Sequence, residues 1–94
     1  MSAMMKFEWD TAKAASNVRK HGVSFDEAGS VLLDHLAVSG PDPDHSIGES
    51  RYITFGMSIC GRLLAVSHTY RPGAIRIISA RRVTRAERKI YEEG

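Results

Sequence analysis

Three successive segments in the second half of the chain have the composition and spacing of β-strands, and this pattern constrains the fold most strongly. RYITFGM (residues 51–57) and RLLAVSHTY (residues 62–70) flank the short sequence SICG, an arrangement typical of an antiparallel hairpin. The sequence RPGA then turns the chain into a third strand over about residues 75–81. A period of two residues is the signature of a strand, so these segments predict a sheet of antiparallel neighbours.

Two helices are predicted ahead of this sheet. Asp10 is a favourable N-cap for a helix over about residues 11–20, and Gly22 is a favourable residue to end it. A second helix is predicted within VSFDEAGSVLLD, where Ser24 and Glu27 have the spacing of a capping box. Its expected buried stripe is Phe25, Ala28, Val31 and Leu32.

The remaining elements complete one α+β domain. KFEWD and LAVS (residues 36–39) have the composition of short strands. Residues 40–49 are predicted to be a loop because of their Pro, Gly and Asp content. Thr84 and Glu87 form a second capping-box sequence, which opens a final helix to about residue 93. The predicted fold is therefore an antiparallel β-sheet with two N-terminal helices and one C-terminal helix.

Length and composition are those of a small globular domain. The 94 residues suit a single domain over residues 1–94, with residues 1–5 expected to be a loose tail. No apolar run approaches the ~20 residues of a membrane span, and no signal peptide is expected at the start. A lone Cys60 rules out an internal disulfide and is compatible with a reducing compartment, so the cytosol is the expected location.

Metal and nucleotide sites are not expected. The histidines are scattered along the sequence and the single cysteine has no companion, which is unlike a zinc site. The compact glycine-rich piece GMSICG lacks the Lys-Ser/Thr ending of a phosphate-binding P-loop. We therefore expect no cofactor.

Charge is divided unevenly between the two halves of the chain. Residues 1–50 hold four Lys/Arg against eight Asp/Glu, whereas residues 51–94 hold nine against three. A basic half on a chain of net charge +2 indicates a phosphate-rich or acidic partner at one face. A solvated surface whose charges pair across the fold explains the same numbers, and charge alone leaves both interpretations open.

Arginines near the ends of the predicted strands are the first candidates for a binding site. Arg62 begins one strand, Arg76 lies within the next, and Arg81 and Arg82 alternate to opposite faces at its end. A guanidinium stays charged and binds phosphate through two hydrogen bonds, so such a set can hold a nucleic-acid backbone. Inside an isoleucine-rich strand, Arg76 must find an anion or a carboxylate. The candidate carboxylates are Glu8, Asp10 and Glu87.

A second polar set lies on the first predicted helix. Lys13, Asn17, Lys20 and His21 are spaced i, i+4, i+7 and i+8, which places them on one stripe. A histidine can act as a general acid or base near neutral pH, as RNA cleavage through the 2′-hydroxyl requires. His21 also stands where a helix ends, and a cation there is stabilised by the helix dipole without any catalytic role.

These motifs together resemble the BrnT family, the toxin component of bacterial type II toxin–antitoxin pairs. The similarity covers about residues 6–92 and is carried by FEWDTAKAASNVRKHGVSFDEA, ESRYITFGMSICGRLLAVSHTYR and IRIISARRVTRAERKIYEE. The matching positions are Phe7, Trp9, Asp10, Lys13, Asn17, Lys20, His21, Gly22, Phe25, Arg51, Gly56, Gly61, Arg62, Arg76, Ser79, Ala80, Arg81, Glu87, Arg88 and Tyr91.

The resemblance implies a RelE-like ribonuclease fold and RNA cleavage that arrests translation. It also implies neutralisation by a BrnA-type antitoxin in a complex of two toxins and two antitoxins, with operator DNA bound only through that complex. In the cleavage expected from it, which needs no metal, the 2′-oxygen attacks the neighbouring phosphorus. The residues expected to be catalytic are Lys20, His21, Arg62, Arg76 and Arg81. Contacts to RNA are expected from Lys13, Asn17, Arg51, Arg82, Arg88 and Tyr91.

A different class of function also fits the sequence. A basic α+β domain can bind nucleic acid without cleaving it, and a decayed toxin can persist only as the partner and co-repressor of its antitoxin. For Arg85 and Arg88, on a predicted helix with several glutamates, a solvated or partner-facing role is the alternative.

Overall fold

The three alternating segments form the centre of the sheet. In the computed structural model, which describes residues 6–42 and 49–94, they are β3 (Tyr52–Met57), β4 (Leu63–Arg71) and β5 (Ala74–Arg82). β3 pairs antiparallel with β4 and β4 antiparallel with β5. At the second turn Arg71 pairs with Ala74, so Pro72 and Gly73 alone connect the strands, and Gly73 has a φ of 72° that favours glycine. The predicted meander is confirmed.

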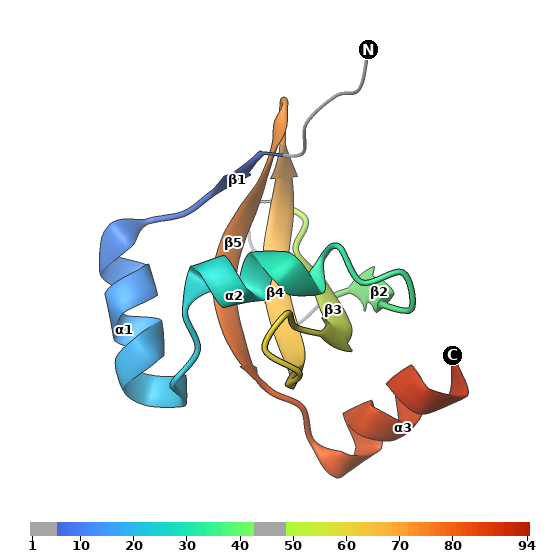
Figure 1. Cartoon of the computed structure of the whole chain (residues 1–94). Coiled ribbons are helices and arrows are strands. Elements are labelled where there is room, and N and C mark those ends of the chain that lie inside the picture. Colours follow the sequence, from blue (N-terminus) through green and yellow to red (C-terminus); the bar gives the residue numbers. More distant parts are fainter. Residues whose placement is uncertain (1–5, 43–48) are drawn as a thin grey trace.

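Two short strands extend this sheet at its edges, giving the order β1-β5-β4-β3-β2 (Figure 1). β2 (Val38–Pro41) pairs antiparallel with β3 and lies two residues beyond the predicted position. β1 (Phe7–Glu8) pairs with β5 in parallel, so the sheet is mixed at that edge instead of fully antiparallel. No tight turn links β1 to β5, so the direction of β1 is not fixed by a hairpin. The expected tail at residues 1–5 and most of the expected loop lie outside the described residues.

The helices begin at the predicted caps. α1 (Thr11–His21) starts where the Asp10 side chain accepts hydrogen bonds from the backbone amides of Ala12 and Lys13, and it ends at Gly22, whose φ is 68°. α3 (Arg85–Glu93) starts with the complete capping box of Thr84 and Glu87. None of the helices in the described part of the chain is long and apolar enough to cross a membrane.

α2 (Phe25–Val31) departs from its prediction at one side chain. The Ser24 hydroxyl accepts a hydrogen bond from the Glu27 amide, as a capping box requires. The Glu27 carboxylate instead accepts hydrogen bonds from Ser58 and Arg62 of the β3–β4 region. The expected box is therefore only half formed, because a charged tertiary partner outcompetes a local backbone amide.

The core lies between the sheet and the two N-terminal helices. α1 packs along β5 and α2 crosses the middle of the sheet, whereas α3 leaves the end of β5 and lies beside β3 (Figure 1). The buried cluster consists of Val23, Phe25, Ala28, Val31, Leu64, Val66, Ile77 and Ala80. Close approach of α2 depends on Gly56, since a Cβ there would lie 2.9 Å from Val31 Cγ1 and 3.1 Å from the Val31 carbonyl oxygen. The opposite face of the sheet is left open by α1 and α2.

A β-bulge in β5 decides which side chains reach that open face. Ser67 pairs with Ser79 but His68 pairs with Ile77, so Ile78 is an extra residue without a partner in β4. Ile77 and Ala80 both point into the core, although an uninterrupted strand would turn them to opposite faces. The bulge therefore places Ser79 and Arg81 on the open face.

A buried histidine joins β4 to its neighbours. His68 is 1% exposed, and its Nε2 lies 2.8 Å from the Thr54 hydroxyl, which lies 2.6 Å from the Ser39 hydroxyl. Its Nδ1 is buried without a hydrogen-bond partner among residues 6–42 and 49–94. Burial lowers the pKa of the imidazole below its ordinary value of 6.5, because the apolar surroundings disfavour the charged form.

We predict that acid destabilises the fold through His68. Below the ordinary value of 6.5 the unfolded chain binds a proton that the folded chain does not, so the free energy of unfolding falls as pH decreases toward the folded-state pKa. The slope reaches at most about 1.4 kcal/mol per pH unit for one group. Urea unfolding between pH 7.5 and 5 measures it. The variant His68→Gln should lose this component of the pH dependence; an identical slope in both proteins would assign it elsewhere.

Candidate functional site

The open face of the sheet carries a groove built from two adjoining hollows. The larger has a volume of about 560 Å³ and the smaller about 180 Å³, and both are lined by His21, Ile78 and Ser79. Charged residues from five parts of the chain line the two hollows, and two of these residues, Asp42 and Glu87, are acidic. We define the groove by Lys13, Lys20, His21, Arg51, Arg81 and Glu87.

α1 contributes one wall of the groove. Lys13, Lys20 and His21 are exposed on the predicted stripe, and the last two lie in the final turn of the helix, where basic side chains complement the helix dipole. Asn17 belongs to the same stripe but is only 5% exposed. The stripe therefore divides into three exposed side chains and one nearly buried side chain, and Asn17 also lines the smaller hollow.

The side-chain amide of Asn17 forms hydrogen bonds with backbone groups. Its Nδ2 donates to the carbonyls of Val23 at 2.9 Å and Ala80 at 2.8 Å, and its Oδ1 accepts from the Ala80 amide at 3.1 Å. These contacts use both donors of the side-chain amide. They tie α1 to the part of β5 that lies between Ser79 and Arg81.

Arg81 is held in the groove by Glu87. Nη1 and Nη2 of Arg81 donate to Oε1 and Oε2 of Glu87 at 2.8 and 2.9 Å, and Nη1 also donates to the Arg82 carbonyl at 3.2 Å. Glu87 is in turn fixed by the Thr84 amide, which donates to its Oε1 at 2.9 Å. The capping box of α3 thus orients the carboxylate that orients Arg81.

This arrangement leaves Arg81 able to bind an anion. Of the five N–H donors of a guanidinium, the bonds above use three, which leaves the Nε–H and one Nη2–H. Those two donors lie on one edge of the guanidinium and match two oxygens of a phosphate. The hydrogen bonds from Arg81 hold the pKa of the Glu87 carboxyl below its ordinary range, so the pair stays ionised near neutral pH.

The floor of the groove combines apolar and hydroxyl groups. Ile53, Phe55 and Ile78 supply apolar surface in the larger hollow, and the half-buried Ser67 and Ser79 lie opposite each other in the β4–β5 pairing. Phe55 offers a ring for base stacking, and serine hydroxyls can donate to phosphate oxygens. The groove therefore combines cationic side chains with hydroxyl groups and an aromatic ring, which suit a ligand with phosphates and flat rings.

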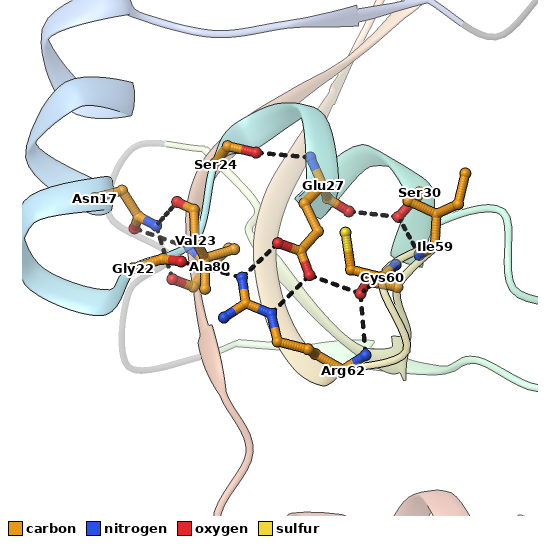
Figure 2. Close-up of polar contacts among 11 residues, drawn as sticks. Asn17, Gly22, Val23, Ser24, Glu27, Ser30, Ile59, Cys60, Arg62 and Ala80 are labelled. Atoms are coloured by element: carbon orange, nitrogen blue, oxygen red, sulfur yellow. Dashed lines mark hydrogen bonds and ion pairs between the residues drawn. The ribbon is translucent and has the colours of Figure 1, made fainter.

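Two of the arginines expected to be catalytic pair with carboxylates outside the groove. Arg62 directs its guanidinium at Glu27 in α2, through Nε at 2.9 Å and through Nη2, and also donates to the Gly22 carbonyl (Figure 2). Arg76 Nη1 lies 3.0 Å from Oε2 of Glu8 in β1, which makes Glu8 the carboxylate that the sequence required. Neither arginine lines the groove.

The residues expected to contact RNA divide in the same way. Lys13 and Arg51 line the groove. Arg82 is exposed next to Arg81 but points to the other face of β5, and Arg88 lies 3.9 Å from Glu92 on the surface of α3. Tyr91 donates its hydroxyl to Asp34 at 2.7 Å, a contact that fastens α3 to the segment after α2.

Several groove residues were not expected from the sequence. Glu87 was considered as a cap and as a partner for Arg76, whereas the structure pairs it with Arg81. Ser67, Ile53 and Phe55 gave no signal beyond strand alternation. Ser79 and Glu87 belong to the matching family positions, which is the signal that could have identified them.

Comparisons with known proteins identify the family and the fold. A family model described as the ribonuclease toxin BrnT of type II toxin–antitoxin systems matches residues 9–87. The fold is similar to the crystal structure of the ribonuclease toxin BrnT from Brucella abortus, with a TM-score of 0.68 and 25% sequence identity. That similarity covers 87% of this chain and 100% of the Brucella chain. A search among curated protein sequences gives no match.

We predict that Glu87→Gln loosens α3. Glutamine still accepts the Thr84 amide at this position of the helix, but it no longer forms the ionic pair with Arg81. No residue of α3 is buried, so a partly exposed ion pair worth about 0.5–1 kcal/mol has a visible effect there. Amide hydrogen exchange within α3 should become roughly two- to fivefold faster, given that energy range.

Glu93→Gln is the matched control, since Glu93 is an exposed carboxylate at the end of the same helix. It should leave the exchange rates of α3 unchanged. Equal rates in wild type and Glu87→Gln would show that the contact with Arg81 does not hold the helix.

Proposed function

Because the chain belongs to the BrnT family of ribonuclease toxins from type II toxin–antitoxin systems, we propose that it cleaves RNA in the groove and thereby inhibits translation. The observation that supports this most directly is the pairing of Arg81 with Glu87, which leaves a two-donor edge of the guanidinium for phosphate. His21 lines the same hollow and provides a group able to transfer a proton.

The proposed reaction is a transesterification within the RNA. The 2′-oxygen forms a bond to the adjacent phosphorus as the bond from phosphorus to the 5′-oxygen breaks, leaving a 2′,3′-cyclic phosphate and a 5′-hydroxyl. His21 accepts the proton of the 2′-hydroxyl, and Lys20 beside it supplies the proton to the departing 5′-oxygen. Arg81 stabilises the negative charge that develops on the phosphorane oxygens. Lys13 and Arg51 hold neighbouring phosphates.

We further propose that the reaction needs no metal ion. Among the described residues, no group of three or more His, Cys, Asp or Glu side chains has an arrangement that could hold one. The cations that the chemistry requires are supplied by side chains of the groove itself. Cleavage should therefore persist in the presence of EDTA.

The proposed cellular setting follows from the family. The partner is a BrnA-type antitoxin, two copies of which bind two copies of this chain in the cytosol, and operator DNA is bound only through that complex. The second candidate function, a non-catalytic basic module or a decayed toxin that serves as co-repressor, is favoured by the number of arginines that pair within the protein. The ribonuclease and the non-catalytic module differ in whether RNA is cleaved.

We predict that Arg81→Ala lowers kcat for RNA cleavage by about 10²–10³, because the developing phosphorane charge loses its donor. The measurement is cleavage of a labelled single-stranded RNA by the purified chain, with the new ends analysed for a cyclic phosphate and a 5′-hydroxyl. Expression of wild type alone should arrest bacterial growth, and expression of the variant should not.

Arg85→Ala is the control, since Arg85 is an exposed arginine of α3 that does not line the groove. It should retain wild-type activity. Intact RNA and normal growth with a folded, well-expressed wild-type chain would sink the nuclease proposal and leave the binding module.

A further inference from the structure

The loop that follows His21 is held by side chains from two different elements. The Gly22 carbonyl accepts a hydrogen bond from Arg62 Nη2 at 3.0 Å, and the next carbonyl, that of Val23, accepts one from Asn17 at 2.9 Å. Figure 2 shows these two donors approaching the loop from different directions. Two consecutive carbonyls are therefore fixed, and the backbone directly after His21 has little freedom to rotate.

Arg62 is itself fixed by a buried carboxylate. Glu27 is 9% exposed, and it accepts from Arg62 through both oxygens and from the Ser58 hydroxyl at 2.7 Å. The Ser58 hydroxyl in turn accepts from the Arg62 backbone amide at 3.2 Å, which closes the ring of contacts. The Arg62 hydrogen bonds hold the pKa of the Glu27 carboxyl below its ordinary range. A buried carboxylate with these partners keeps the guanidinium in one orientation.

Asn17 extends the same restraint to the other side of the groove. Besides the Val23 carbonyl, its amide binds both the carbonyl and the amide of Ala80. Ala80 lies between Ser79 and Arg81, which both line the groove. The Asn17 side chain thus connects the loop that follows His21 to the strand that contains Arg81.

We propose that Asn17, Arg62 and Glu27 are positioning residues for the RNA cleavage: they fix His21 relative to Arg81 and do not contact the RNA. This inference rests on the proposed function, and it changes the roles that the sequence suggested for Asn17 and Arg62. Asn17 lines the smaller hollow, but both of its donors are occupied by backbone carbonyls and its Oδ1 by a backbone amide. Arg62 faces α2 instead of the groove. The hypothesis differs from a phosphate-binding role in a measurable way.

A positioning residue and a phosphate-binding residue affect RNA binding and the cleavage rate differently. A side chain that neutralises a phosphate of single-stranded RNA contributes about 0.7 to the slope of log K against log salt, whereas a positioning residue contributes nothing to it. Misplacement of a reacting group by about 1 Å can cost on the order of 10²-fold in rate without weakening binding. The ratio of kcat to KM effects therefore separates the two roles.

The test uses the full chain with two substitutions that preserve side-chain size. Arg62→Lys keeps the charge but cannot bind Glu27 and the Gly22 carbonyl together, and Glu27→Gln keeps the shape but removes the ionic pair. Each should lower kcat roughly 10- to 100-fold with KM within about twofold of wild type, as expected for lost positioning. Arg85→Lys, a control outside the groove and the network, should change neither constant.

Binding is measured separately, with a fully 2′-O-methylated RNA that cannot be cleaved. The salt slope of Arg62→Gln should equal that of wild type. A slope smaller by about 0.7 would show that Arg62 contacts a phosphate and would overturn the proposal. Wild-type kcat in folded Arg62→Lys and Glu27→Gln would also overturn it, because the network would then serve stability alone. Urea unfolding establishes that each variant is folded under assay conditions.

An inactive wild-type chain would contradict the proposed function but would not decide the positioning role. In that case the amide chemical shifts of His21, Ser79 and Arg81 are compared between wild type and Glu27→Gln. Chemical-shift changes confined to the neighbourhood of Glu27 would overturn the proposal that the network connects His21 to Arg81. Changes that extend to Ser79 and Arg81 would support it.

Discussion

The side-chain amide of Asn17 is the interaction on which the arrangement of this protein most depends. β1 pairs with β5 at Ile75 and Arg76, and within residues 6–42 and 49–94 no strand lies beside the far end of that edge of β5. The backbone amide and carbonyl of Ala80 are buried there and require partners, and the amide of Asn17 supplies both. An asparagine in the middle of α1 thus acts in place of a sixth strand. Because of it, the helix with Lys20 and His21 lies along the strand with Arg81.

Sequence reasoning was most successful where local patterns determine structure. The period of two residues in β3, β4 and β5, the N-cap at Asp10 and the capping box at Thr84 all appear as predicted, because each depends on residues a few positions apart. The β-bulge at Ile78 has no such signal. It is an extra residue in an apolar run, and it reverses which of the following side chains face the core.

The site was predicted less completely because its decisive contacts join distant residues. Asn17 and Ala80 are separated by 63 positions, and Glu27 and Arg62 by 35. A sequence shows that an arginine needs an anion, but not whether that anion is a carboxylate of the protein or a phosphate of a ligand. Here Glu8 and Glu27 pair with Arg76 and Arg62, whereas the Arg81 guanidinium combines a carboxylate partner with a place in the groove.

The difference among these arginines bears on why a small domain contains a partly buried ion pair between Glu27 and Arg62. Desolvation offsets much of the attraction between Glu27 and Arg62, so an apolar pair of similar volume can match or exceed its stability. An apolar pair could not, however, donate a hydrogen bond to the Gly22 carbonyl or prevent the loop after His21 from rotating. Stability and positioning are therefore separable at this network. A chain selected only for stability has little reason to retain Glu27 and Arg62, whereas a chain that must hold a proton-transfer group near Arg81 has a direct one.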